Sequence, residues 1–331
     1  MCTTIFYKTE DDRHFFGRTL DFPQLPIGGL VSIPAGTRLY ALDGHAVDTQ
    51  CAYMGMGCAE AKTIMADGVN EYGLSGSTQY IRDGAEYQER DGSGTYENVS
   101  GIELLSYMLG RCESVKDVEE QLKRVRVVAQ ADPVFGEIAP VHHMFADKSG
   151  ACIVVEYTRD GPDIMENPVG VMTNNPEFRW HLSNLKMQSD TVMYSLHDSD
   201  DTRNMAVRTK SVTAHPLPQP GDFSSPSRFI RGTSLTGMIN GKFSGEEAVI
   251  TGIHVLEALS VPRGVYYLMG KEQYTRYLAL LSLEEPGYYF KTYHDMALKQ
   301  VRLRDVPAKA PKLLYQIGQT VRVEQLLKHK L

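Results

Sequence analysis

The second residue of the chain, in "MCTTIFYK", is a cysteine that removal of Met1 would make the amino terminus. A terminal cysteine carries a thiol and an α-amine on one residue. An α-amine has a pKa near ~8, against about 10.4 for a lysine, so it accepts a proton near neutral pH. Cys2 could therefore be a nucleophile that brings its own general base. The alternative is that Cys2 only begins the first strand.

Two charged residues in "GRTLDF" could assist such a nucleophile. Arg18 and Asp21 lie near the end of the second expected strand, which would pair with the strand that starts at Cys2. A guanidinium near a thiol favours the thiolate, and a carboxylate near an α-ammonium orients the terminus. On a regular strand, positions 18 and 21 face opposite sides, so we expect both to reach Cys2 only through a turn or bulge. A commonplace surface ion pair is the alternative.

Metal and nucleotide motifs are missing from the sequence. There is no H-E-x-x-H, no C-x-x-C, and no G-x-G-x-x-G after a strand. His142 and His143 are neighbours on an expected strand, so their side chains point to opposite faces. We expect one of them in the core and the other on the surface, and no metal site between them.

The elements that must position these residues begin with strands. The segments "TTIFYKT" and "HFFGRTLDF" flank the polar "EDDR" and predict a hairpin. Helices are then predicted in "ENVSGIELLSYMLG" and "SVKDVEEQLKRVRVV". Ser114 is the expected N-cap of the second helix, with Asp117 three residues on. The apolar stripe of that helix is Val115, Val118, Leu122 and Val125.

Further strands, two more helices and a final group of strands complete the pattern. The segment "EFRWHLSNLKM" predicts a helix, and residues 188–225 are polar and rich in Ser, Asp and Pro, which predicts a long loop. Because strands and helices do not alternate regularly, the pattern favours antiparallel sheets covered by helices over a parallel sheet. We expect residues 1–331 to form a single domain.

Composition and charge exclude several classes of protein. The net charge of −7 and the lack of Lys or Arg runs argue against nucleic acid as a partner. No segment has the length and apolarity of a membrane span, and the amino-terminal residues do not form a secretory signal. Five widely spaced cysteines are typical of a reduced, cytoplasmic protein rather than a disulfide framework.

Five ordered blocks of the sequence resemble the choloylglycine hydrolases, a family of N-terminal-nucleophile enzymes that includes bile salt hydrolases and penicillin V acylases. The blocks are "MCT", "GRTLDF", "ADGVNEYGL", "GVMTNNPEFRWH" and "GDFSSPSRFIR". The resemblance runs from residue 1 to about residue 293. It implies a four-layer αββα sandwich that hydrolyses a linear amide through a Cys2 thioester, without metal or organic cofactor.

The resemblance also assigns roles to individual residues. It implies Cys2 as the nucleophile, assisted by Arg18 and Asp21, with Asn174 and Arg228 completing the catalytic group. Its oxyanion hole combines the Asn174 amide with the backbone N–H at Tyr80. Without the resemblance, Asn174 could be a turn residue before Pro176, and Arg228 a helix-surface arginine. By analogy, the substrate pocket is expected to be lined by Phe22, Ile64, Met65, Phe135 and Ile138.

The residue at position 80 bears on the substrate. The resemblance implies asparagine there in bile salt hydrolases and tyrosine in penicillin V acylases, and an aromatic ring suits a phenoxyacetyl group. Tyr80 therefore favours a penicillin V acylase-like enzyme acting on a small-molecule amide. The alternatives are a conjugated bile salt hydrolase, then an N-acyl homoserine lactone acylase, or an inactive relative that only binds a ligand. The family also implies a cytoplasmic homotetramer.

Overall fold

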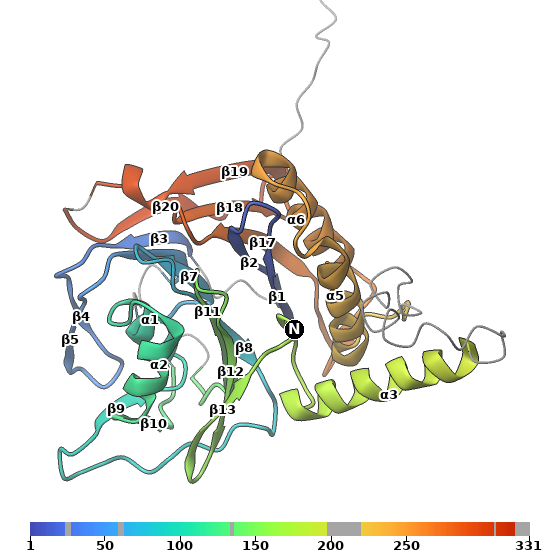
Figure 1. The fold of residues 1–331 in the computed structure, drawn as a ribbon. Coiled ribbons are helices and arrows are strands. Elements are labelled where there is room, and N and C mark those ends of the chain that lie inside the picture. The colour runs from blue at the N-terminus through green and yellow to red at the C-terminus, as the bar shows by residue number, and fades with distance from the viewer. Residues whose placement is uncertain (24–27, 59–62, 133–135, 197–219, 308, 322–331) are drawn as a thin grey trace, which may run out of the picture.

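Two antiparallel sheets lie face to face in the computed structural model, and helices cover the outer face of each (Figure 1). The structure describes residues 1–23, 28–58, 63–132, 136–196, 220–307 and 309–321. Between the helical layers, these ranges form the sandwich that the sequence predicted. The αββα fold class is therefore confirmed, and the expectation of a single domain over residues 1–331 stays a prediction.

The six-stranded sheet contains the amino terminus. Cys2 lies opposite Leu20 and Lys8 opposite His14, which confirms the predicted hairpin. The strand on the other side of β2, β17 (Thr275–Ser282), comes from the far end of the sequence. In spatial order the strands are β14 (Val171–Met172), β1 (Cys2–Lys8), β2 (His14–Asp21), β17 (Thr275–Ser282), β18 (Gly287–Thr292) and β19 (Asp295–Arg302).

The eight-stranded sheet is built mostly from residues 29–166, and the last described strand of the chain, β20, pairs at one edge. Its strands face β1 and β2 across the interior. In spatial order they are β13 (Gly161–Glu166), β12 (Cys152–Thr158), β11 (Val141–Ala146), β8 (Ser75–Tyr80), β7 (Asp67–Asn70), β6 (Tyr53–Gly57), β3 (Gly29–Ile33) and β20 (Lys312–Gln316).

Two helical layers cover the sheets. Helices α5 (Ser225–Ile239) and α6 (Gly245–Leu259) pack on the six-stranded sheet, and α1 (Leu104–Leu109) packs on β7 and β8 of the other. Figure 1 shows α2 (Val115–Leu122) beside α1 on that outer side. The structure also has three short strand pairs, namely β4 (Arg38–Tyr40) with β5 (Ala46–Asp48), β9 (Glu97–Ser100) with β10 (Val125–Val128), and β15 (Tyr267–Leu268) with β16 (Lys271–Glu272), and a 3₁₀ turn at Leu303–Asp305.

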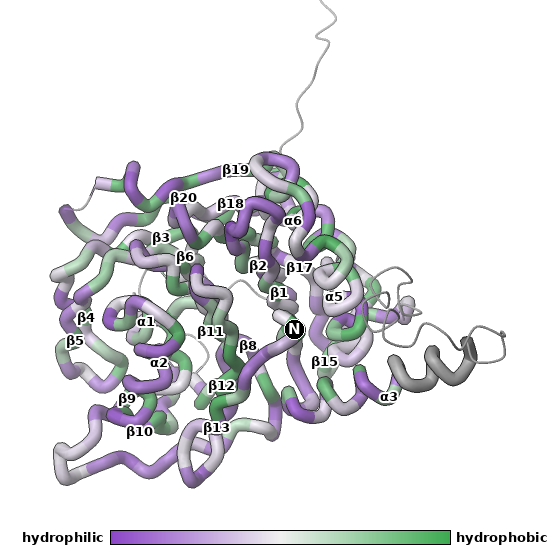
Figure 2. The backbone as a smooth tube through the Cα atoms, in the orientation of Figure 1, coloured by the Kyte–Doolittle hydropathy of each residue, from purple (hydrophilic) through white to green (hydrophobic). Residues whose placement is uncertain are grey.

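The apolar residues gather between these layers. In Figure 2, strands near the centre such as β12 carry hydrophobic stretches, whereas the outer turns are hydrophilic. One core cluster joins β1, β2 and β17 to α5 and α6, and it includes Cys2. A second cluster lies between the eight-stranded sheet and the α1–α2 layer. Burial of these side chains holds the layers together.

Two predicted helices end or begin differently in the structure. Ser114 caps α2 and accepts a hydrogen bond from the Asp117 N–H, as expected, but the helix ends at Leu122. Val125 is not on the helical stripe, because it begins β10, which pairs in parallel with β9. The β-branched run in "VRVV" outweighs the helical spacing there. The same pairing shortens the preceding helix, α1, to a start at Leu104.

A third helix extends further than the sequence predicted. Helix α3 spans Phe178–Leu196, so it occupies residues 188–196 of the expected loop at 188–225. The polar composition of residues 188–196 favours a loop, but no Gly or Pro interrupts this segment, so the helix continues through it. At its other end the expected loop gives way to α5 at Ser225. Residues 197–219 lie outside the described residues.

The contact between α6 and β1 depends on a glycine. The Tyr7 hydroxyl donates to the Ala248 carbonyl at 2.9 Å, and a methyl group at Gly252 would overlap that hydroxyl and lie 3.0 Å from a Leu280 methyl. We predict that Gly252→Ala destabilises the fold by about 1–3 kcal/mol through overpacking, although alanine favours helix.

Gly237 provides the matched control, because it lies in α5 with nothing within 4 Å of an added Cβ. Gly237→Ala should stabilise the protein by roughly 0.5–1 kcal/mol. Urea unfolding of both variants and the wild type measures the free energies. Equal effects from the two substitutions would contradict the packing argument.

Candidate active site

Cys2 lies at the start of β1, buried in the interior near the end of the sandwich where β2 finishes. Cys2 is 3% exposed. An Arg18 guanidinium nitrogen donates to the Cys2 Sγ at 2.9 Å, which brings a fixed positive charge to the thiol. Such a charge favours the thiolate form. The first two residues singled out by the sequence are therefore in direct contact.

Arg18 and Asp21 both reach the amino-terminal residues, but from opposite faces of β2. The β1–β2 register is continuous from Cys2–Leu20 to Lys8–His14, and the register shift at this point lies on the other side of β2, between the β17 partners of Leu20 and Asp21. Arg18 points toward the other sheet. Asp21 contacts Met1 through its main chain: the Asp21 carbonyl accepts from the Met1 ammonium, and the Asp21 N–H donates to the Met1 carbonyl. Strand alternation thus places the two side chains on separate sides of the nucleophile.

Arg228 is the buried arginine on the other side. It lies in the first turn of α5 and is 0% exposed, so the surface alternative is excluded. Its guanidinium donates to the Cys2 carbonyl, to the Thr3 hydroxyl at 2.6 Å and to Asn174 Oδ1 at 3.0 Å. The Asp21 carboxylate lies 3.9 Å away. Burial lowers the pKa of Arg228, and this carboxylate opposes the effect.

Asn174 connects Cys2 to the facing sheet. It follows β14, and its Oδ1 accepts from the Cys2 N–H at 2.7 Å. Its Nδ2 donates to the Tyr80 carbonyl at 2.7 Å. Because an amide NH₂ carries two hydrogens, the Asn174 side chain has a further donor for a substrate oxygen. The turn alternative does not account for these contacts.

Two histidines that the sequence did not connect with the site hold the segment around Asn174. His181 Nε2 lies 2.9 Å from the Asn174 carbonyl, and His142 Nε2 lies 2.9 Å from the Thr173 carbonyl. Glu156 accepts from the Phe178 N–H at 2.9 Å and contacts His142 Nδ1 at 3.1 Å. These contacts fix the main chain on both sides of Asn174.

The expectation of one core and one surface histidine at positions 142 and 143 is wrong, because both side chains are buried. They do point to opposite faces. His142 contacts Glu156, whereas His143 Nδ1 lies 2.6 Å from the Tyr157 hydroxyl. Both faces of β11 are covered in this sandwich, so alternation along the strand does not send either residue to solvent.

Tyr80 presents its main chain to Asn174. Ile81 donates to the Pro140 carbonyl at 2.9 Å, next to β11. Consecutive N–H groups of a strand point to opposite edges, so the N–H and C=O of Tyr80 point away from β11. The carbonyl on that edge accepts from Asn174. The Tyr80 N–H therefore faces the same side as the Asn174 amide.

The expected pocket residues lie at different places. The rings of Phe22 and Tyr80 are 5.6 Å apart, and Ile64 packs in a small cluster beside Tyr80. Met65 is buried in the core under α1, and Ile138 is 49% exposed. Phe135 lies outside the described residues. Their role in substrate binding stays a prediction.

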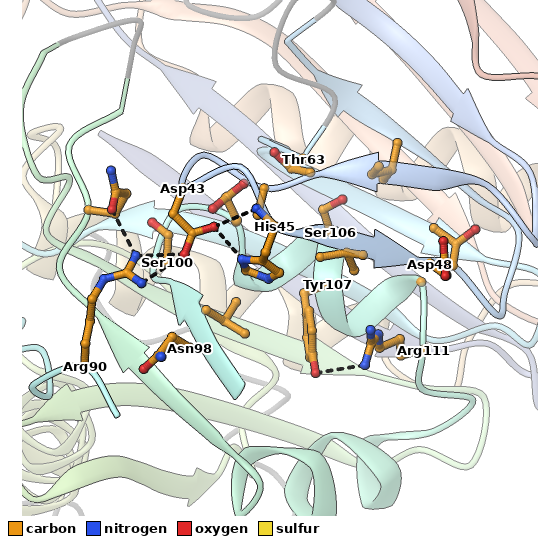
Figure 3. A pocket seen from close by; sticks show the side chains of 18 residues that line it. Asp43, His45, Asp48, Thr63, Arg90, Asn98, Ser100, Ser106, Tyr107 and Arg111 are labelled. Carbon is orange, nitrogen blue, oxygen red and sulfur yellow. Dashed lines mark hydrogen bonds and ion pairs between the residues drawn. The ribbon is translucent and has the colours of Figure 1, made fainter. Parts of the chain in front are cut away.

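A small hollow lies against α1, apart from the site at Cys2. Figure 3 shows Asp43 bonded to both His45 and Arg90 on its wall, so these charged groups satisfy one another. The volume open to water-sized molecules is about 20 Å³, which suits roughly one water. This hollow is too small for an organic substrate, and none of the predicted catalytic residues lines it.

The sequence of this chain matches the model of a known family. The model of the linear amide C–N hydrolases, choloylglycine hydrolase family, matches residues 2–311. This chain belongs to that family. The resemblance seen in the sequence is therefore confirmed. The protein is a linear amide C–N hydrolase of the choloylglycine hydrolase family.

Named relatives match nearly the whole hydrolase. It is 28% identical over 307 residues to the bile salt hydrolase/transferase of Clostridium perfringens, with 91% of this chain and 92% of the relative covered. It is 29% identical over 323 residues to the conjugated bile acid hydrolase of Lactobacillus gasseri, with 95% and 99% covered.

Solved structures give the same fold. The mutant C2A conjugated bile acid hydrolase from Clostridium perfringens superimposes with a TM-score of 0.81 at 25% identity, covering 99% of this chain and 100% of that one. Penicillin V acylase from Agrobacterium tumefaciens gives 0.76 at 18% identity, covering 97% and 94%. The second likeness shows the fold alone. In the part of the chain that the structure describes, no helix is long and apolar enough to cross a membrane.

Burial keeps His181 of the hydrolase neutral and makes stability depend on pH. Burial lowers the pKa of His181 to about 4, from an ordinary 6.5, so the unfolded chain binds a proton that the folded protein rejects between these values. We predict that lowering the pH from 7 to 4 removes about 3 kcal/mol of stability through this residue. Stability therefore rises with pH across this window and the His181 contribution is constant below it.

The test compares urea unfolding of wild type and His181→Gln at several pH values. The variant loses the ring contact with Phe229, whose centroid is 4.7 Å away, so it should be less stable at pH 7, but its stability should fall less steeply with acid. His254→Gln is the control, because the His254 side chain is 71% exposed. A slope for His181→Gln equal to that of the wild type would refute the assignment.

Proposed function

We propose that this hydrolase cleaves the amide bond of conjugated bile salts, with Cys2 as the nucleophile. The convergence of Arg18, Asn174 and Arg228 on Cys2 is the observation that carries the chemistry. The substrate class is supported by relatives named for bile salts or bile acids, which match over nine tenths of both chains.

Penicillin V is the second candidate substrate. The tilted pair of Phe22 and Tyr80 offers an aromatic surface that suits a phenoxyacetyl group. The structural likeness to a penicillin V acylase, at 18% identity, supports the fold and not the substrate. The comparisons therefore favour bile salts over the penicillin V reading that position 80 supported.

Removal of Met1 would prepare the general base. In the structure the Cys2 nitrogen is an amide nitrogen and cannot accept a proton. Once Met1 is cleaved, that nitrogen becomes an α-amine beside Asn174 Oδ1. The Asp21 carbonyl, which accepts from the Met1 ammonium in this structure, also lies near the amino terminus. A terminal amine in this position can take the proton of the thiol and pass it to the leaving amine.

Acylation then follows from the placement of the side chains. The thiolate, favoured by Arg18, attacks the amide carbon to form an S–C bond, and the carbonyl oxygen becomes an oxyanion. We assign the stabilisation of that oxyanion to the Asn174 amide and the Tyr80 N–H, which face the same side. The C–N bond breaks and the amine leaves with the proton from the α-ammonium.

Deacylation uses the same groups in the reverse order. The α-amine, now neutral, takes a proton from a water molecule that attacks the thioester carbon. The oxyanion forms again at the same donors, the S–C bond breaks, and the acid product leaves. Arg228 holds the Cys2 carbonyl and Asn174 Oδ1 in both halves of the cycle, so it maintains the geometry rather than exchanging protons.

We also propose that the enzyme works in the cytoplasm as a homotetramer. Family resemblance supports the assembly. The sequence supports a reducing compartment, because its five cysteines are widely and irregularly spaced, unlike those of a disulfide framework.

A substrate panel tests the proposed function. Penicillin V, glyco- and tauro-conjugated bile salts and acyl homoserine lactones would be compared by kcat/KM, and a conjugated bile salt is expected to give the highest value. Cys2→Ala should abolish hydrolysis and leave the melting temperature close to that of the wild type. Cys152→Ala, which removes another buried thiol, should remain active. Turnover by a well-folded Cys2→Ala protein would overturn the nucleophile.

Asn174 is expected to act mainly in the transition state. Asn174→Ala removes one oxyanion donor and should lower kcat by ~10²–10³-fold, with a smaller effect on KM. Asn175→Ala is the matched control, because the Asn175 amide accepts from the Arg82 N–H at 2.8 Å instead of contacting Cys2. Steady-state kinetics of both variants decide the role. A change confined to KM in Asn174→Ala would mean that the residue only positions substrate.

A further inference from the structure

A buried carboxylate lies behind Arg18, on the sheet that faces the nucleophile. Asp67 begins β7 and is 0% exposed, and its Oδ2 lies 3.8 Å from an Arg18 guanidinium nitrogen. The same guanidinium nitrogen donates to the carbonyl of Ala66, the residue before it. Asp67 belongs to the block "ADGVNEYGL", but neither the sequence nor the family roles set out above gave it a function.

Two tyrosines from the other sheet hold the Asp67 carboxylate. The Tyr277 hydroxyl donates to Oδ2 and the Tyr288 hydroxyl donates to Oδ1. Arg18 lies opposite Ala279, two residues from Tyr277, and Tyr288 lies opposite Leu281. Opposed residues of antiparallel strands share a face, and so do residues two apart. Arg18 and both tyrosines therefore point from one face of the six-stranded sheet toward Asp67.

The two tyrosines can only donate to Asp67. Burial, followed by the charge of Asp67, raises the pKa of both Tyr277 and Tyr288 well above the ordinary value of 10.0. Their hydroxyls thus stay protonated. Burial also raises the pKa of Asp67, while Arg18 and the two hydroxyl donors oppose that rise and favour the ionised carboxylate. The ground for an ionised Asp67 is geometric: two hydroxyl donors and a guanidinium surround the carboxylate and favour its charged form against the effect of burial.

We propose that Asp67, held by Tyr277 and Tyr288, is a positioning residue that supplies the permanent counter-charge of Arg18 while the Cys2 sulfur changes its charge. The proposal rests on the proposed function of Cys2. A buried guanidinium without a counter-ion is strongly unfavourable. When the sulfur is a thiolate, it shares the charge of Arg18. When the sulfur is protonated or acylated it is neutral, and Asp67 is then the carboxylate that remains beside Arg18.

This arrangement predicts the direction in which loss of the Asp67 charge shifts the pH of Cys2 thiolate formation. Without the negative charge of Asp67, Arg18 would be balanced only by a thiolate, so the thiolate would form at lower pH. The neutral thioester would be disfavoured relative to the thiolate, so acylation would slow. Other charged or titratable groups near Cys2 in the described residues, which the test leaves unchanged, are Asp21, Arg228, Tyr80 and the amino terminus.

Asp67→Asn is the direct test, since it removes the charge and keeps the shape. The ultraviolet absorbance of the Cys2 thiolate is titrated against pH in the purified enzyme, with the corresponding Cys2→Ala protein subtracted as background. The midpoint of thiolate formation should fall by about one pH unit or more. In addition, kcat should fall at least ~10-fold while KM changes less than about 3-fold. Because the titration needs no substrate, it remains informative if the proposed substrate is wrong.

Tyr277→Phe and Tyr288→Phe are the second set of variants, and they leave the Asp67 carboxyl in place should Asp67→Asn not fold. Each removes a hydroxyl donor that favours the ionised carboxylate. A fraction of Asp67 should then be protonated, so the midpoint should move in the same direction by a smaller amount. The matched control is Tyr53→Phe, because Tyr53 is equally buried and its hydroxyl contacts Ser106 at 2.6 Å, away from Arg18. Its thiolate midpoint should stay at the wild-type value.

Three results would overturn the proposal. The midpoint of a folded Asp67→Asn enzyme could coincide with that of the wild type or rise. The two tyrosine variants could leave the midpoint unchanged, or Tyr53→Phe could shift it as far as they do, which would indicate a general loss of packing. A purely structural role for Asp67 would lower the melting temperature without moving the thiolate titration.

Discussion

Two buried guanidinium groups flank the first residues of β1, and the need to balance their charges shapes the surrounding structure. Arg18 is 1% exposed and Arg228 is 0% exposed. A buried charge without partners costs several kcal/mol, so each group must meet carboxylates or carbonyl oxygens inside the protein. Arg18 finds them between the two sheets, and Arg228 finds them between a sheet and α5. The layers of the sandwich are therefore joined where Cys2 lies.

Local signals in the sequence predicted a large part of this fold. The polar "EDDR" between two apolar strands fixed the first hairpin, and Ser114 with Asp117 marked the start of α2 correctly. These features depend on residues close together in the chain, where propensity and capping act directly. Local signals alone did not predict the αββα class or the residues that gather at Cys2. Predicting these features required that ordered blocks from distant parts of the chain be recognised together.

Long-range contacts account for what the sequence did not predict. Val125 has helical spacing, yet a parallel partner strand from residues 97–100 makes it part of a strand. Asp67 is far in sequence from Arg18 and from both tyrosines, so no local pattern links them. Phe135 lies outside the described residues, and the roles of the other pocket residues depend on a substrate. For this reason, the sequence predicted which residues lie together around Cys2 better than it predicted the residues that support them.

Polar contacts between the two sheets also fix how one sheet is aligned on the other. Strands within a sheet are aligned by main-chain hydrogen bonds, but two stacked sheets are held mainly by apolar packing, which has little direction. Beside the contacts of Asp67, the Thr4 and Ser77 hydroxyls meet at 2.9 Å between β1 and β8. Directional bonds of this kind oppose sliding of one sheet over the other. The end of the sandwich that holds Cys2 is thus locked in alignment, so apolar residues farther along the interface can change size in evolution with less effect on the geometry of the site.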